Sequence, residues 1–160
     1  MAAGPAPPHL TRTNRPGAVL FACTMNAVRS PMAAAILRHL SGRAIYVESA
    51  GIREGEPDPF VTTVMNEIGI DVSEHRPRTL HDLNDSSFDL IVTLSPEAHH
   101  QALEFTRTMA VDVEYWATFD ASIMIGSGNR EQVLGSYRQV RDQLFAKIKT
   151  RFELSGGPSV

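Results

Sequence analysis

Cys23 and Arg29 are the two residues of this sequence whose types and spacing could do chemistry together. Cys23 is the one cysteine among 160 residues; it follows the apolar run 18–22, and Arg29 comes six positions later. The intervening residues are enough to wrap a loop around one tetrahedral oxyanion, with the backbone amides pointing inward. Arg29 would close this cradle with a planar, two-pronged grip on two oxygens. The same positive field would stabilise a thiolate, which makes Cys23 a candidate nucleophile.

A helix start directly follows this loop. Ser30 can cap free helix amides, and Pro31 is favoured at the first helical position, so a helix is predicted to run to about Ser41. The Ser30 hydroxyl can also donate a hydrogen bond to the thiolate. A lone cysteine after a strand is more often a small buried apolar residue. The order of strand, loop, arginine, serine and helix is what favours an anion site over that alternative.

Composition narrows the possible classes of protein. One cysteine excludes an internal disulfide, a zinc site of several thiolates and a disulfide relay within the chain. The net charge of −3 gives no case for nucleic acid. Five arginines and no acidic residue precede Glu48, which fits either ordinary surface arginines or an anion site. No apolar segment is long enough for a membrane span and no secretion signal is visible, so we expect no membrane partner and a cytoplasmic protein.

Strand-like and helix-like segments alternate along the chain. This alternation predicts an α/β fold: a single-domain three-layer sandwich, with a four-stranded parallel sheet flanked by helices on both faces. In such a sheet the ligand site lies at the carboxyl ends of the strands, where Cys23 stands. We expect a disordered tail over 1–16, a domain over 17–154 and a flexible tail over 155–160. Strands are expected near 18–22, 45–48, 88–94 and 110–116, and helices near 31–41, 60–67, 96–105 and 129–152.

The residues around Cys23 resemble a known family. The segment 19–32, VLFACTMNAVRSPM, is similar to the phosphate-binding loop of the low-molecular-weight protein tyrosine phosphatases, which are related to the thioredoxin-linked arsenate reductases. The resemblance continues through Glu48-Ser-Ala-Gly, 69–75, 88–91 and 116–120, and covers roughly 18–152. It therefore extends over a whole domain rather than one motif.

This resemblance implies a mechanism. Cys23 would attack phosphorus and form a phosphocysteine, and Asp120 would protonate the leaving group and then activate water. Arg29 and the loop amides would bind the phosphate, so no metal or cofactor is expected. On its residue type alone, Asp120 could equally be a loop aspartate that caps a turn. The implied phosphate-binding residues are Thr24, Met25, Asn26, Ala27, Val28, Arg29 and Ser30.

The resemblance also implies residues that keep the loop rigid. Asn26 matches a position with a left-handed backbone, which Asn tolerates well. Ser49 and His75 match residues that hydrogen-bond Asn26, although His75 could also be an exposed loop histidine. Asp58, between two prolines, is interpreted as a turn residue. The adjacent His99 and His100 fall on different faces of a helix, so they are not expected to form a metal pair.

Several positions depart from the family pattern. Met25 stands where glycine is usual, Val28 where many members have a second cysteine, and Ala121 where proline is usual. Leu94-Ser95 replaces a Met-Asp pair. The residues after Asp120 include no tyrosine pair: they are Ser122, Ile123 and Met124. The cysteines that resolve the disulfide in thioredoxin-linked arsenate reductases are absent.

Three functions are consistent with these residues. The first is a metal-independent phosphomonoesterase acting on a phosphotyrosine protein or a small aryl phosphate. The second is arsenate reduction with an external thiol, because Thr24 resembles reductase-like members. The third is a non-catalytic phosphate-binding or phosphoprotein-binding module, which Met25 and Ala121 favour.

Overall fold

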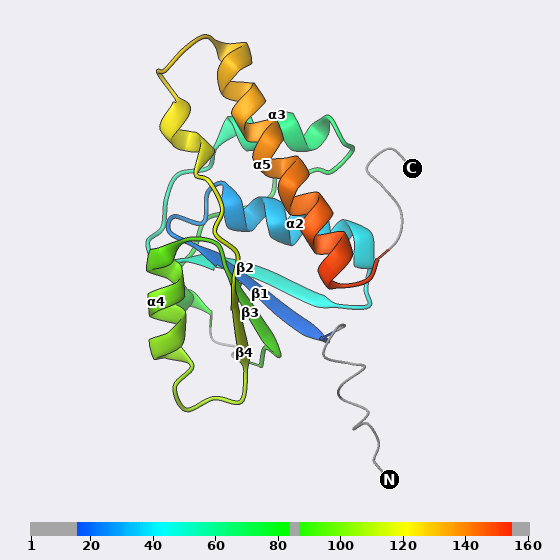
Figure 1. Cartoon of the computed structure of the whole chain (residues 1–160), viewed down its shortest axis with the longest axis vertical. Coiled ribbons are helices and arrows are strands. Elements are labelled where there is room, and N and C mark those ends of the chain that lie inside the picture. The colour runs from blue at the N-terminus through cyan, green and yellow to red at the C-terminus, as the bar shows by residue number, and fades with distance from the viewer. Residues whose placement is uncertain (1–15, 84–86, 155–160) are drawn as a thin grey trace.

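A computed structural model of the chain describes residues 16–83 and 87–154 (Figure 1). The predicted tails at 1–16 and 155–160 lie outside these residues, apart from Pro16. Four parallel strands form one sheet in the order β2-β1-β3-β4. The strands are β1 (Ala18–Cys23), β2 (Tyr46–Gly51), β3 (Leu90–Thr93) and β4 (Asp112–Tyr115).

Helices cover both faces of the sheet. The helices are α2 (Arg29–Ser41), α3 (Pro59–Asn66), α4 (Pro96–Phe105) and α5 (Arg130–Arg151), with short 3-10 helices η1 (Leu80–Asp82) and η2 (Ala121–Met124). Helices α2, α3 and α5 share one core with the sheet, while α4 and η1 pack in a second core on the other face (Figure 1). The predicted three-layer α/β sandwich is therefore confirmed.

The central strands are buried because helices lie on both sides of them. Five of the six residues of β1 and all four of β3 are buried, which accounts for their continuously apolar sequences. Strand β2 extends beyond the predicted 45–48 to Gly51. Its last three residues pair in register with Phe21, Ala22 and Cys23. Pairing, rather than strand propensity, thus decides where β2 ends.

The start of α2 differs from its prediction. Ser30 is not the cap: the helix begins at Arg29, and Val28 occupies the capping position without a side-chain hydrogen bond. The Ser30 hydroxyl instead lies 2.9 Å from the sulfur of Cys23 and accepts a hydrogen bond from Asn26. The first amides of α2 are consequently not satisfied by a side-chain cap.

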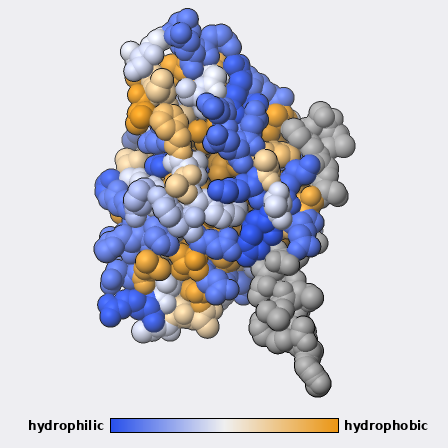
Figure 2. Space-filling model, viewed as in Figure 1, coloured by the Kyte–Doolittle hydropathy of each residue, from blue (hydrophilic) through white to orange (hydrophobic). Residues whose placement is uncertain are grey.

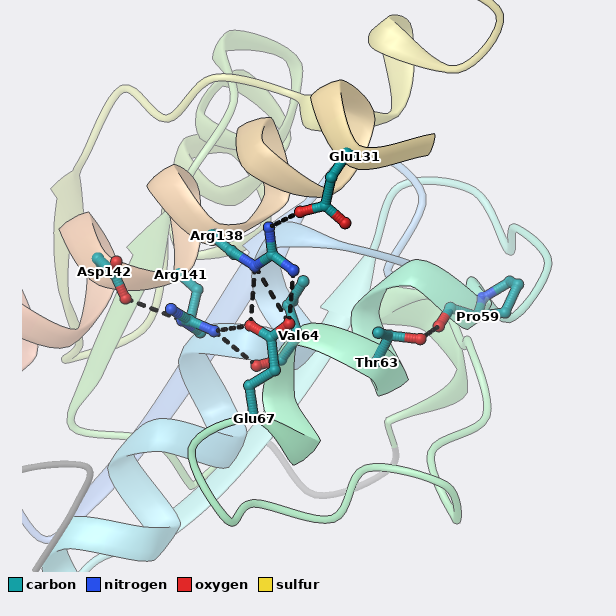
Figure 3. A network of polar contacts seen from close by, with 8 residues as sticks. All are labelled: Pro59, Thr63, Val64, Glu67, Glu131, Arg138, Arg141 and Asp142. Atoms are coloured by element: carbon teal, nitrogen blue, oxygen red, sulfur yellow. Dashed lines mark hydrogen bonds and ion pairs between the residues drawn. The ribbon is translucent and has the colours of Figure 1, made fainter. Parts of the chain in front are cut away.

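An ion-pair network joins α3 to α5 (Figure 3). Glu67, at the end of α3, accepts hydrogen bonds from Arg138 and Arg141 of α5 at 2.7 to 3.1 Å. Arg141 is buried and also donates to the Val64 carbonyl at 2.8 Å. These contacts fix α3 against α5, and η2 in turn packs on α5.

Candidate active site

Cys23 ends β1, at the carboxyl edge of the sheet, and the 23–29 loop connects it to α2. Its side chain is 2% exposed. The sulfur lies 2.9 Å from Ser30 Oγ and accepts from the Ser30 amide at 3.4 Å. The hydroxyl and the amide of Ser30 therefore both lie against this one sulfur atom.

Asn26 holds the loop from inside. It is fully buried and has a left-handed backbone, with φ of 55°. Its amide nitrogen donates to Ser30 Oγ at 2.8 Å and to Ser49 Oγ at 3.0 Å. Its side-chain oxygen accepts from the Arg78 amide at 2.9 Å, and its carbonyl lies 2.8 Å from His75 Nε2. The side-chain nitrogen, the side-chain oxygen and the backbone carbonyl of Asn26 thus each have a hydrogen-bond partner.

The segment after β2 holds the loop from outside. The amides of Ile52 and Arg53 both donate to the Thr24 carbonyl at 2.9 Å, and the Gly55 amide donates to the Met25 carbonyl at 2.9 Å. This approach requires glycine at position 51, since a Cβ there would lie 2.8 Å from the Asn26 nitrogen. The resemblance includes Gly51, but only the structure shows which contact depends on it.

Arg29 connects this loop to the loop after β4. Arg29 is 8% exposed, and its guanidinium donates to the Thr118 carbonyl at 3.1 Å. It also lies 3.8 Å from Asp120 Oδ2. Asp120 caps η2 by accepting from the Ser122 amide at 3.0 Å and from the Ser122 hydroxyl at 2.7 Å. One carboxylate oxygen therefore fixes the turn while the other faces Arg29, so capping and a chemical role do not compete.

A cavity of about 180 Å³ brings these groups together. Cys23, Arg29 and Asp120 line it although they come from two segments nearly a hundred residues apart. Met25, Ala27 and Val28 also line it. The other predicted loop residues have different places: Thr24 donates to Ser95 Oγ at 2.9 Å, Asn26 bonds the framework, and Ser30 lies against the thiol.

The sequence interpretation missed part of the cavity wall. Asp58 lines it, caps α3 by accepting from the Phe60 amide at 2.8 Å, and accepts from the Tyr137 hydroxyl at 2.6 Å. Burial, followed by the hydrogen bond to Asp58, raises the pKa of Tyr137 well above its ordinary value. Asp58 before Pro59 was a visible helix-cap signal, but its contact with α5 depends on the fold. Gly55, Glu56 and Ser122 complete the lining that the sequence did not reveal.

His75 is half-buried behind the loop. Burial lowers its pKa below 6.5, and the hydrogen bond to the Asn26 carbonyl acts in the opposite direction. The neutral ring can donate through Nε2 to that carbonyl, so the interaction does not need a charged histidine.

The surface beside the cavity is apolar over the η2 segment (Figure 2). Ile123 and Ile125 are 63% and 52% exposed, and Met25 is 39% exposed. Ala121, in the place of the usual proline, is fully buried. Aliphatic side chains are therefore exposed in the segment after Asp120, where the sequence has no tyrosine pair.

Comparison with known proteins identifies the family. The model of the low molecular weight phosphotyrosine protein phosphatase family matches residues 18–153. The chain belongs to this family. The arsenate reductase of Shouchella clausii is 33% identical over 133 residues, which is 82% of this chain and 91% of that protein. The probable low molecular weight protein-tyrosine-phosphatase EpsP of Ralstonia nicotianae is 41% identical over 78 residues, which is 48% of this chain and 54% of that protein.

Two solved structures share the fold. An arsenate reductase in its phosphate-binding state has a TM-score of 0.65 at 25% identity, covering 86% of this chain and 98% of that one. The YwlE arginine phosphatase has a TM-score of 0.69 at 22% identity, covering 85% and 93% respectively. Within the described residues, no helix is long and apolar enough to cross a membrane. The same part of the chain contains no cluster of three metal-ligating side chains.

Proposed function

We propose that this family member is a metal-independent phosphomonoesterase that acts on phosphotyrosine proteins or aryl phosphates. The main support for this proposal is the cavity that Cys23, Arg29 and Asp120 line together. The arsenate reductase relative captured in a phosphate-binding state supports a phosphate or similar oxyanion as the ligand. The apolar surface around Ile123 suits the uncharged ring of an aryl ester.

Each group has one part in the proposed reaction. Cys23 Sγ attacks phosphorus, an S–P bond forms and the ester P–O bond breaks. Asp120 gives its proton to the leaving oxygen and then takes one from the water that hydrolyses the S–P bond. Arg29 and the loop amides hold the equatorial oxygens, and the uncapped start of α2 adds positive potential. Phosphate binding would exchange the Arg29–Asp120 contact for contacts to the substrate, which frees Asp120 for proton transfer.

An aryl-phosphatase assay in the presence of a metal chelator tests this proposal. Wild-type protein should turn over, Cys23→Ser should be inactive, and Asp120→Ala should lose about 100-fold or more in kcat, as expected for a general acid. Asp112→Ala, an exposed aspartate on β4, is the matched control and should retain full activity. Tight phosphate binding without turnover in wild type would instead favour the non-catalytic module.

Arsenate reduction is the second candidate, because the most extensive relatives reported above carry that name. The chain has one cysteine, so the two electrons must come from Cys23 and an external thiol. Arsenate would leave as arsenite and water, with a mixed disulfide between Cys23 and that thiol. Arsenite formation that depends on added thiol would support this reaction, and none with any thiol would reject it.

A further inference from the structure

A second cavity of the described chain is larger than the one that contains Cys23. It has a volume of about 710 Å³ and lies behind the 23–29 loop, between α2, the end of β2 and the 69–78 segment. We call it the arginine cavity, because Arg38, Arg76 and Arg78 all line it. His39 and His75 also line it. Its residues come from three separate parts of the sequence, so no single motif reveals it.

The three arginines are not fully neutralised by carboxylates. Arg38 and Arg78 both pair with one residue, Glu48. Arg38 also donates to the Val47 carbonyl through Nε and Nη2. Arg78 donates to the Ser49 carbonyl through Nε, and both carbonyls belong to the edge strand β2. Since each guanidinium has five N–H groups, donors remain on both. The Arg38 side chain is 49% exposed, so a ligand can reach it.

Arg76 has fewer charged partners than Arg38 and Arg78. Among the described residues, its guanidinium donates to the backbone carbonyls of Ser73 and His75, at 3.2 and 2.9 Å, and has no carboxylate contact. Two acidic residues, Asp71 and Glu74, line the same cavity, but Asp71 is turned back to accept from the Ser73 amide at 2.9 Å. Burial, followed by repulsion from Arg78, lowers the pKa of Arg38, so a neighbouring anion would relieve an existing cost.

The arginine cavity is connected to the reactive loop through Asn26. Three of its lining residues contact Asn26: Ser49 accepts from the side-chain nitrogen, His75 bonds the backbone carbonyl, and the Arg78 amide bonds the side-chain oxygen. Asn26 is the loop residue with the left-handed backbone. A ligand that moves or orders these three residues therefore acts on the loop that carries Cys23.

We propose that the arginine cavity binds a small, multiply charged anion such as a polyphosphate or phosphate ester, and that this binding is coupled to anion binding at the 23–29 loop through Asn26. Guanidinium groups recognise such anions by charge-assisted, bidentate hydrogen bonds. The site requires no turnover, so it does not depend on which reaction Cys23 performs.

Amide NMR with inorganic tripolyphosphate as the probe tests binding directly, in protein whose 23–29 loop is occupied by orthovanadate. Saturable shifts should appear in residues 71–79 and around Arg38. Arg38→Gln combined with Arg76→Gln should weaken binding about tenfold or more, the effect of losing charge-assisted hydrogen bonds. Arg76→Gln alone, at an exposed side chain that does not support the fold, should weaken it about threefold. Arg107→Gln, which changes an exposed arginine in the turn after α4, is the matched control and should leave binding unchanged.

The coupling is tested by titrating orthovanadate with and without tripolyphosphate. The vanadate dissociation constant should change at least about twofold in wild type and not in the double variant, because linkage between two sites is reciprocal. Shifts confined to the 23–29 loop, or equal weakening in the Arg107→Gln control, would overturn the site. Binding without any change in vanadate affinity would overturn the coupling. Loss of aryl-phosphatase activity in wild type affects neither result.

Discussion

Asn26 shapes the 23–29 loop through both its backbone and its side chain. Its left-handed backbone turns the chain, while its side chain joins Ser30 to Ser49 and to the Arg78 amide. Glycine could supply the backbone conformation, but it could not supply the hydrogen bonds. Asparagine is therefore needed at this position for two separate reasons, and substitutions can separate them.

Asn26→Gly and Asn26→Ala form a matched pair. Both should destabilise the fold by about 2 kcal/mol, because buried donors and acceptors lose their partners. Asn26→Ala should lose about 1 kcal/mol more stability than Asn26→Gly, since alanine is strained at positive φ. Chemical denaturation measures the stability, and vanadate titration should show weaker binding in both variants. Asn66→Ala, at an exposed site, is the control; equal stability of Asn26→Ala and wild type would contradict the assignment.

The buried environment of His75 predicts a pH dependence of stability. Because burial lowers its pKa in the folded state, the unfolded chain takes up a proton at a higher pH than the native state does. The contribution to stability is complete above pH about 6.5 and decreases as the pH falls from there through the folded-state pKa. Unfolding free energies measured between pH 5 and about 7.5 should show this slope.

His75→Gln supplies the comparison, because glutamine can still donate to the Asn26 carbonyl but does not titrate. The slope should be smaller in this variant than in wild type. His100→Gln, which replaces an exposed histidine of α4, should leave the slope unchanged. An identical slope in His75→Gln and wild type would rule out His75 as its source.

At the scale of elements, the sequence predicts which helices and strands exist better than it predicts where they begin and end. The sequences of β1 and β3 are continuously apolar because both faces of these strands are buried, so both strands can be recognised from the sequence alone. The β4 segment was predicted too long, at 110–116, because its edge position leaves fewer paired residues. The predicted start of α2 was wrong: the Ser30 hydroxyl does not cap the helix but lies against the Cys23 sulfur, the other contact that the sequence had suggested for it.

The contact between α3 and α5 predicts a second effect on stability. Glu67→Gln should destabilise the protein by about 1–2 kcal/mol, because buried Arg141 and its neighbour Arg138 lose a charged acceptor. Hydrogen bonding to Arg138 lowers the pKa of Glu67 below 4.5, so its contribution is present above that pH and is lost as the pH falls further. Thermal and denaturant unfolding at neutral and acidic pH measure both effects.

Glu104→Gln is the control for this element-scale prediction. Glu104 pairs with Arg107 on the exposed face at the end of α4, where an ion pair contributes about 0.5 kcal/mol or less. It should change stability far less than Glu67→Gln does. Equal effects of the two variants would show that the α3–α5 network is no stronger than an ordinary surface pair.

At the scale of the whole molecule, the fold decides which residues meet. The spacing of Cys23 and Arg29 places them in one loop, so their proximity follows from the sequence. Asp120 follows β4 and Asp58 precedes α3, so spacing alone does not bring either residue to Cys23. The family resemblance implied Asp120, while the place of Asp58 in the cavity follows only from the fold. The arginine cavity is a stronger example, because residues 38 and 76–78 meet only after α2 has packed on the sheet.

A single cysteine in the whole chain predicts how oxidation affects the protein. Peroxide would convert the Cys23 thiolate to a sulfenic acid with release of hydroxide. Buried Val28 lines the same cavity in the place where a second thiol could have formed a disulfide, so the chain offers no internal resolving cysteine. Peroxide should therefore abolish reaction of Cys23 with an alkylating reagent and, with it, any aryl-phosphatase activity. Added dithiothreitol, given before further oxidation, should restore both, and orthovanadate bound during exposure should protect both. Full recovery after removal of peroxide, without any reductant, would show that Cys23 has another route back to the thiol.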